Sequence, residues 1–392
     1  MSEYIPAEKA EFDPQVTHDT LLETAPRRLR YRPGTGAETR EEHRNDLKEV
    51  LTAVLGLPRE RISLEPHWFP EESRALPSGP EIGSPDTAPP MFSRITVRRV
   101  EFFTEEKSRA IGWLVTPTND SGMGRPAAKS GNRTPKPTII CLQGHTSGAH
   151  ISLGEERFAQ DHGDITAGKD YALQAARRGY NAFVLEQRNF GERMDSREPS
   201  RRQHYDYENP FTDERCRHQA MVAILVGRTV LGERVLDVQR AVDLLNTHPD
   251  VLPDRIYCMG NSGGGTTAFY ATCLEPRIAG VMPSCSFAPY ASTIGTIDHC
   301  SDNYLPGALK WFDMPDLALL IAPRPMVVIA GKKDPIFPLN AITEAYTQAA
   351  QIYQEQNATE HLAFHVGAEG HTFYPEAWQS FEGVTGIGSA DE

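Results

Sequence analysis

A serine stands at the centre of a glycine-rich turn, the run Gly-Asn-Ser-Gly-Gly-Gly at residues 260–265, with the serine at 262. A short apolar run, 255–259, precedes this turn, and a helix-like segment, 266–274, follows it. The pattern Gly-x-Ser-x-Gly between a strand and a helix is typical of a turn that exposes a nucleophile, because side chains two positions to either side would collide with both elements. The pattern therefore predicts nucleophilic catalysis by Ser262.

A serine hydroxyl is a weak nucleophile at neutral pH, so it needs a base, and the base needs an acid that orients it. Asp334 follows the apolar run 326–330, and His371 follows the apolar run 361–366. Glu369 is the competing carboxylate, but it lies too close to His371 in sequence to be the natural orienting group. We therefore expect Asp334 and His371 to complete a triad with the serine, in the chain order Ser, Asp, His.

A tetrahedral oxyanion needs N–H donors around it. The first is expected to be the amide of Gly263, directly after the nucleophile, and the second an amide in the loop 143–148 that follows an apolar strand. His145 is the preferred second donor and Thr146 the next choice. The imidazole of His145 is incidental to this prediction, because the chemistry uses its backbone N–H.

From about residue 93 onwards, short apolar runs alternate with helix-like segments. Such alternation predicts an α/β fold with a mostly parallel central sheet and helices on both faces. The expected strands are 94–103 and 109–116 as a hairpin, then 138–143, 181–186, 255–259, 280–286, 325–330 and 361–366. The expected helices are 169–178, two within 214–245, 266–274, 338–353 and one after Pro375.

Residues 1–92 differ from the rest and are expected to form a helical and irregular extension that packs on the main catalytic body, 93–392. An amphipathic helix is expected over 38–55 and an irregular connector over 70–90. The extension could also serve as a contact in a homo-oligomer.

Two segments, 187–217 and 288–312, could cap the site. The first is rich in arginine and includes Arg188, and the second is rich in aromatic residues and includes Tyr304 and Trp311. Arginine and aromatic faces suit anionic or sugar-like substrates, so these three residues are candidate substrate contacts. Because runs of surface charge are usually solvated, the first segment is more simply interpreted as a solvated loop.

The composition argues against several classes of partner. The 392 residues carry a formal net charge of −13, which disfavours binding to nucleic acids and anionic membranes. No apolar run approaches the roughly 18 residues of a membrane helix, and the N-terminus does not resemble a signal peptide. The six cysteines form no Cys-x-x-Cys pair, so we expect reduced cysteines and a cytoplasmic protein.

Two alternative interpretations of these residues predict a cofactor or a metal. The run Gly263-x-Gly265-x-x-Ala268 fits a loose dinucleotide fingerprint, but no carboxylate closes the next strand to bind a ribose. His361 and His365 could provide half a zinc site, but no third ligand stands nearby in sequence. The sequence therefore predicts no cofactor and no metal.

The chain resembles the α/β-hydrolase superfamily, and within it the bacterial branch of acetyl-xylan-esterase-like and dienelactone-hydrolase-like proteins. The similarity covers roughly residues 93–385. It rests on the glycine-rich turn, on Leu-Ile-Ala-Pro-Arg-Pro-Met at 320–326 with Gly-Lys-Lys-Asp-Pro-Ile-Phe-Pro at 331–338, on Gly-His-Thr-Phe at 370–373, and on Asn-Tyr-Leu-Pro-Gly at 303–307. The resemblance implies the fold, the Ser262, Asp334 and His371 triad, and ester hydrolysis through an acyl-enzyme.

The sequence departs from this family in two places. The usual His-Gly before the oxyanion donor is Gln143-Gly144 here, which concerns the local geometry of that donor. The secretion signal of many polysaccharide-active relatives is not recognisable, so we expect a small intracellular ester, with an acetyl or short acyl group on a sugar or small aromatic alcohol, rather than polymeric xylan.

Two other functions remain open from the sequence. A serine peptidase or amidase of the prolyl-oligopeptidase type shares the triad order, but such enzymes usually carry a large propeller or cap, which residues 1–92 are too few to build. A non-catalytic hydrolase-like binding protein is the other alternative, and the retention of all three triad residues argues against it.

Overall fold

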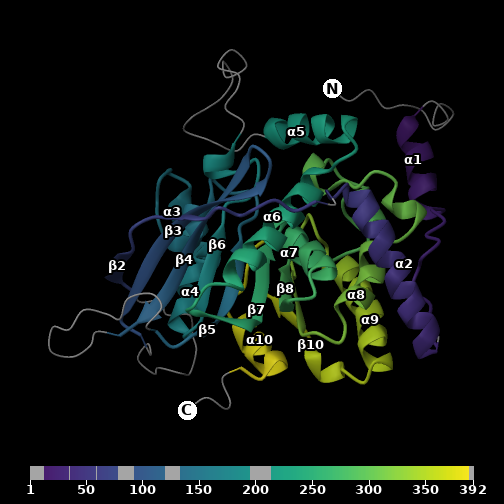
Figure 1. The fold of residues 1–392 in the computed structure, drawn as a ribbon. Coiled ribbons are helices and arrows are strands. Elements are labelled where there is room, and N and C mark those ends of the chain that lie inside the picture. The colour runs from purple at the N-terminus through teal and green to yellow at the C-terminus, as the bar shows by residue number, and fades with distance from the viewer. Residues whose placement is uncertain are drawn as a thin grey trace.

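The computed structural model describes residues 13–34, 36–58, 60–77, 92–119, 133–194 and 213–387. Their centre is a ten-stranded sheet with the order β1-β3-β4-β6-β5-β7-β8-β9-β10, in which β2 also pairs with β3 (Figure 1). The neighbouring strands β6, β5, β7, β8, β9 and β10 are all parallel, whereas β1, β2, β3 and β4 are joined by antiparallel pairs. The predicted α/β fold with a mostly parallel sheet is confirmed.

The elements from residue 93 onwards follow the predicted order, with ends shifted by a few residues. The strands are β1 (His67–Trp68), β2 (Glu72–Ala75), β3 (Arg94–Glu105), β4 (Ser108–Thr118), β5 (Lys136–Leu142), β6 (Asn181–Leu185), β7 (Val251–Asn261), β8 (Ile278–Ser284), β9 (Met326–Gly331) and β10 (Leu362–Gly367). The α-helices are α1 (Pro14–Glu23), α2 (Ala37–Leu55), α3 (Asp161–Asp164), α4 (Tyr171–Arg177), α5 (Asp213–Leu225), α6 (Val230–Leu245), α7 (Gly263–Leu274), α8 (Ala318–Ile321), α9 (Leu339–Glu355) and α10 (Ala377–Thr385).

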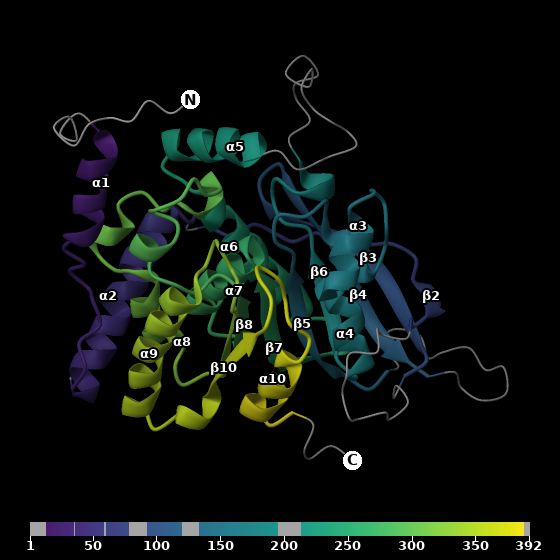
Figure 2. The ribbon, with the colours of Figure 1, turned by 180° about the vertical axis from the view of Figure 1, so that it is seen from behind.

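The two faces of the sheet are both apolar, and each is covered by its own set of helices (Figures 1 and 2). In β5, Ile140 and Leu142 join the core beneath α6 and α7, whereas Ile139 and Cys141 join the core beneath α4 and α10. Successive side chains of a strand point to opposite faces, so a strand buried on both faces reads as a continuous apolar run. This is why the apolar runs in the sequence located the strands.

The N-terminal residues contribute to both the helical layer and the sheet. In α2, Leu47, Leu51 and Leu55 are fully buried in the same core as α6 and α7, and Gly56 ends the helix in a left-handed conformation. The two short strands β1 and β2 pair with β3 and were not predicted, since runs of two and four residues carry too little periodicity to detect. The predicted connector 70–90 therefore contains a strand at 72–75, and its part from 78 onwards lies outside the described residues.

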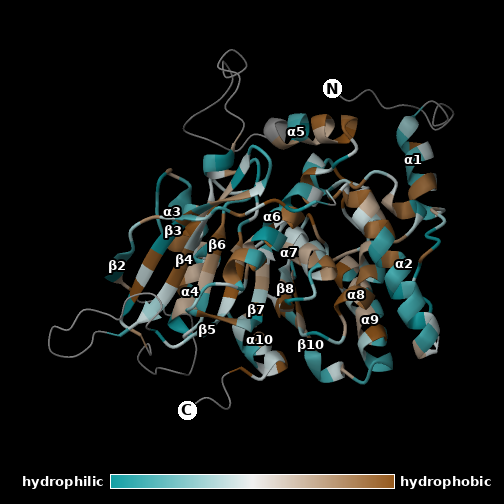
Figure 3. Cartoon of the chain, viewed as in Figure 1, coloured by the Kyte–Doolittle hydropathy of each residue, from teal (hydrophilic) through white to brown (hydrophobic). Residues whose placement is uncertain are grey.

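Hydropathy separates the interior from most of the surface (Figure 3). Brown and teal residues are mixed along the outer helices, whereas the C-terminal half of α5 is largely brown, and Leu225 there is 84% exposed. None of the helices in the described ranges is both long enough and apolar enough to cross a bilayer.

Candidate active site

Ser262 lies in the sharp turn between β7 and α7. Its backbone has φ 56° and ψ −126°, a strained conformation for a residue with a side chain. A Cβ on Gly260 would lie 2.4 Å from the carbonyl carbon of Gly264, and a Cβ on Gly264 would lie 2.2 Å from the carbonyl oxygen of Leu142. These two glycines are therefore required sterically, as expected for a turn that holds a nucleophile at the end of a strand.

His371 and Asp334 are in direct contact. The Nδ1 atom of His371 lies 2.8 Å from Oδ2 of Asp334, and the other carboxylate oxygen accepts hydrogen bonds from the amides of Ile336 and Phe337. Burial alone would raise the pKa of Asp334, but the hydrogen bond and charge of His371 outweigh burial, so the pKa lies below its usual value. The ring of His371 also stacks on Phe337 with a centroid separation of 5.9 Å. The imidazole is thus held by a buried, ionised carboxylate.

The loop 143–148 runs directly against the nucleophile turn. A Cβ on Gly144 would lie 3.1 Å from Cβ of Ser262, and a Cβ on Gly263 would lie 3.2 Å from the His145 ring. The amide of Thr146 already donates to the carbonyl oxygen of Gly144 at 2.8 Å. This bond favours His145 over Thr146 as the second oxyanion donor, beside Gly263.

A pocket of about 330 Å³ connects these parts. Its lining includes Ser262 and His371 from the nucleophile side and Gly144, His145 and Thr146 from the adjacent loop. The remaining lining residues are Lys169, Asn261, Ile297, Asp298, His299, Cys300 and Ile336. The pocket volume lies near the lower end for small-molecule sites, so it suits a small substrate.

Glu186 anchors the loop and was not predicted as a functional residue. It is 1% exposed at the end of β6, and Oε1 accepts hydrogen bonds from Nε2 of Gln143 at 2.7 Å and from the amide of Ala149 at 3.1 Å. One carboxyl group therefore holds both ends of the loop that carries Gly144 and His145. A carboxylate closing the apolar run 181–185 was the available signal in the sequence.

Glu186 should also make stability depend on pH. Burial raises its pKa from 4.5 to about 7. Below pH 4.5 Glu186 is protonated in both the folded and the unfolded chain, so its contribution to the free energy of unfolding is fully present there. As the pH rises to 7, Glu186 ionises first in the unfolded chain, and the folded chain loses up to about 3 kcal/mol of stability.

Urea unfolding at pH 5 and pH 8 should show this loss in the wild type and a smaller loss in Glu186→Gln, which cannot ionise. Equal losses in both proteins would contradict the assignment.

The three candidate substrate contacts lie elsewhere. Arg188 forms ion pairs with Glu105, Glu233 and Asp237, which tie the end of β6 to α6 and β3. The hydroxyl of Tyr304 donates to the carbonyl oxygen of Ile294, and the Trp311 ring faces the guanidinium of Arg28. Within the described ranges, none of the three predicted residues belongs to the pocket lining.

Residues 195–212 of the arginine-rich segment 187–217 lie outside the described residues. The other cap candidate, 288–312, does contribute to the pocket, through Ile297, Asp298, His299 and Cys300. All six cysteines of the chain are free and buried.

A sheet of this strand order with a strained serine turn is typical of the α/β-hydrolase class. Residues 126–369, which are more than half of the chain, match the model of the abhydrolase family. The chain belongs to this family. It is 24% identical over 242 residues to YtaP of Bacillus subtilis (strain 168), which is named as a hydrolase, and the match covers 61% of this chain and 75% of YtaP.

Solved structures share the fold at low sequence identity. A Bacteroides fragilis protein described as an acetyl xylan esterase superposes with a TM-score of 0.65 at 16% identity, over 90% of this chain and 81% of that one. A glucuronoyl esterase from Solibacter usitatus superposes with a TM-score of 0.62 at 15% identity, over 92% and 96% of the two chains.

Proposed function

We propose that the protein is a serine hydrolase that cleaves a carboxylic ester through an acyl-enzyme. The observation that carries the proposal is the hydrogen-bonded pair of His371 and Asp334, whose histidine lines the same pocket as Ser262 in its strained turn. A serine, a histidine and a buried carboxylate in this relation form the minimal apparatus for acyl transfer.

In the proposed reaction Ser262 attacks the ester carbonyl while His371 accepts its proton through Nε2. The contact of Nδ1 with Asp334 orients the ring and stabilises the imidazolium that forms. The amides of Gly263 and His145 donate to the oxyanion, and the free N–H groups at the start of α7 add to the positive potential there. His371 then protonates the departing alcohol, and water releases the acyl group by the same steps in reverse.

The substrate that the pocket supports best is a small ester, with an acetyl or short acyl group. The pocket volume of about 330 Å³ leaves little room for a long acyl chain beside an alcohol. The structural relatives named as acetyl xylan and glucuronoyl esterases support an alcohol or acid of carbohydrate type. Polar side chains on the pocket wall, Lys169, Asp298 and His299, could bind hydroxyl groups of such a substrate.

The peptidase or amidase alternative gains no specific support.

Three expectations remain predictions from the sequence: a cytoplasmic location, no nucleic-acid partner, and a homo-oligomer contact through the N-terminal extension. In the monomer, α2 already uses its apolar face against the core, which leaves its polar face for such a contact.

A fluorophosphonate probe combined with a substrate panel tests the proposal. The probe should label one peptide, which contains Ser262, and the purified protein should hydrolyse acetyl esters of sugars or small aromatic alcohols faster than esters of long acyl chains. Labelling at another serine, or cleavage of peptide amides with no cleavage of esters, would overturn the proposal.

A further inference from the structure

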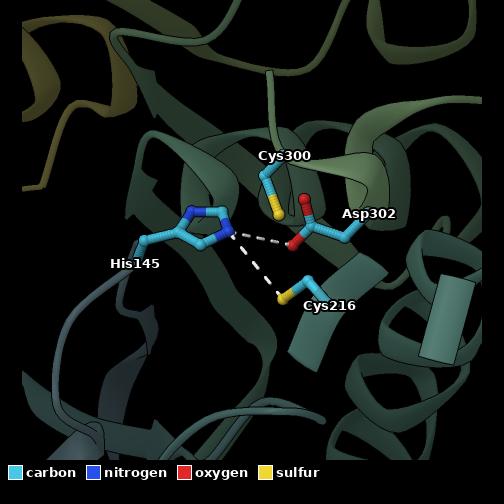
Figure 4. Close-up of side chains that lie close together, drawn as sticks. All are labelled: His145, Cys216, Cys300 and Asp302. Carbon is cyan, nitrogen blue, oxygen red and sulfur yellow. Dashed lines mark hydrogen bonds and ion pairs between the residues drawn. The ribbon is translucent and has the colours of Figure 1, made fainter. Parts of the chain in front are cut away.

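Four side chains with metal-binding atoms converge beside the active-site pocket, and the proposed reaction uses none of these atoms (Figure 4). They are His145 from the loop after β5, Cys216 from α5, Cys300 from the segment before the short 3₁₀-helix η7 (Ser301–Asn303), and Asp302 within η7. One ligand atom from each lies within 4.8 Å of all the others. Three segments that are far apart in sequence, the loop after β5, α5 and the stretch 300–302, thus direct these atoms to one point.

The separations fit the edges of a small coordination polyhedron. Nε2 of His145 lies 3.3 Å from Oδ2 of Asp302 and 4.0 Å from Sγ of Cys216. Ligand atoms around a tetrahedral zinc ion lie about 3.3–3.8 Å apart, given Zn–N and Zn–S bonds of about 2.0–2.3 Å. The widest separation among the four atoms is at most 4.8 Å, so closure by about 1 Å or less would bring them around one ion.

Burial and ligand type indicate which ion would bind. Cys216, Cys300 and Asp302 are at most 9% exposed, whereas the side chain of His145 is 28% exposed and, with Cys300, lines the pocket. Two thiolates with one imidazole and one carboxylate suit zinc, whereas magnesium and calcium prefer oxygen ligands throughout. Four protein ligands also leave no open position, which is typical of a structural rather than a catalytic zinc site.

Arg234 completes the charge balance of the cluster. Its Nη1 lies 2.5 Å from Oδ2 of Asp302, and its Nη2 lies 3.8 Å from Sγ of Cys216. With two thiolates and one carboxylate, the three negative charges would be matched by a divalent cation and this guanidinium. Hydrogen bonds from a neighbouring cation to metal ligands are ordinary outer-shell contacts, which orient the ligands.

The second cluster of metal-binding side chains is already explained. Cys285, Asp334 and His371 also lie close together, but His371 and Asp334 form the hydrogen bond that the reaction uses, and Cys285 donates to the carbonyl oxygen of Thr372. Within the described residues, the first cluster is the one that remains without a role.

We propose that His145, Cys216, Cys300 and Asp302 form a structural zinc site at the edge of the active-site pocket. The ion joins α5 and the segment 288–312 to the loop that carries the amide of His145. This inference goes beyond the proposed hydrolysis and does not depend on it, because the site is defined by ligand atoms that the reaction does not use.

Zinc binding must displace protons. Burial disfavours a charged imidazole, but the Asp302 carboxylate outweighs it and raises the pKa of His145 to about 10 in the metal-free cluster. Zinc takes neutral histidine and ionised thiols, so any proton held by His145 or by a cysteine of the cluster leaves as the ion enters. Zinc affinity should therefore fall on acidification.

Metal analysis of the full chain, purified without chelators, tests the proposal. We expect about one zinc ion per chain, and about one per chain again after stripping with a chelator and reloading. Cobalt(II) in place of zinc should give the thiolate-to-metal charge-transfer absorption of a cysteine-ligated site. Zinc should also raise the Tm of the stripped protein, because it binds the folded chain in preference to the unfolded chain.

Cysteine variants separate this site from adventitious binding. Cys216→Ser and Cys300→Ser should each weaken zinc binding by more than about 100-fold, since even outer-shell changes cost 10–100-fold. The matched control is Cys273→Ser, a buried cysteine whose sulfur contacts the carbonyl oxygen of Leu317 outside the cluster, and it should bind zinc like the wild type.

Three results would overturn the site, and none requires a variant to fold. They are a wild-type chain that reloads with less than about a tenth of an equivalent of zinc, cobalt loading without the charge-transfer band, and a thiol titration in which Cys216 and Cys300 are found as a disulfide in the native protein. Esterase activity plays no part in these measurements, so failure of the proposed function and failure of the zinc site are distinguishable.

Discussion

Replacement of Ser262 by alanine should lower kcat by at least about 10⁵-fold, because the variant has no nucleophile while the pocket and oxyanion donors remain. Alanine meets the same backbone constraint at φ 56° as serine, so the fold should be retained. Initial rates with a short-chain aryl ester measure the effect, and thermal unfolding followed by circular dichroism verifies the fold.

The matched control for this variant is Ser152→Ala. The hydroxyl of Ser152 is buried and has no hydrogen-bond partner within the described residues, so its loss should change neither folding nor rate by much. A Ser262→Ala protein that keeps a rate within tenfold of the wild type would show that another group attacks the ester.

Asp334→Asn should lower kcat by about 10⁴-fold, because it would change the tautomer of His371 while the fold is retained. Oδ1 of Asp334 accepts hydrogen bonds from the amides of Ile336 and Phe337, so the amide oxygen of an asparagine must take that position. The NH₂ group then faces Nδ1 of His371, which has to accept, and the ring proton moves to Nε2. A protonated Nε2 cannot remove the proton of Ser262.

The neighbouring carboxylate provides a sharp comparison. Glu369 lies close to His371 in sequence, but its side chain is exposed and pairs with Lys333 at 3.0 Å. Glu369→Gln should therefore keep kcat within about twofold of the wild type, as exposed ion pairs contribute little. A large loss in Glu369→Gln together with a small loss in Asp334→Asn would reassign the orienting acid.

The longer strands, most of the longer helices and the nucleophile turn could be predicted from local sequence because local rules dictate them. Buried parallel strands must be apolar on both faces, so the buried parts of β5, β7 and β9 read as short apolar runs. Steric exclusion at Gly260 and Gly264 leaves a glycine pattern that is visible without any partner. The strand ends then bring Asp334 and His371 toward Ser262, since parallel strands present their carboxyl ends at one edge of a sheet.

Other parts of the site depend on contacts between segments that local patterns do not encode. Arg188 looked like a substrate contact, but Asp237 on α6 and Glu105 on β3 bind its guanidinium, and neither partner is near it in sequence. Glu186 holds the loop 143–148 only because β6 ends beside β5 in the sheet.

The cluster of His145, Cys216, Cys300 and Asp302 shows the same division most clearly. From the amino-acid order, His145 counted only for its backbone amide, and the cysteines had no metal-ligand spacing. Packing of α5 on η7 and on the loop after β5 places their ligand atoms within 4.8 Å of one another. The local sequence determines which backbone conformations are possible and which segments are buried. Contacts between individual polar side chains depend instead on how the helices and strands pack, because the residues in contact are far apart in the chain.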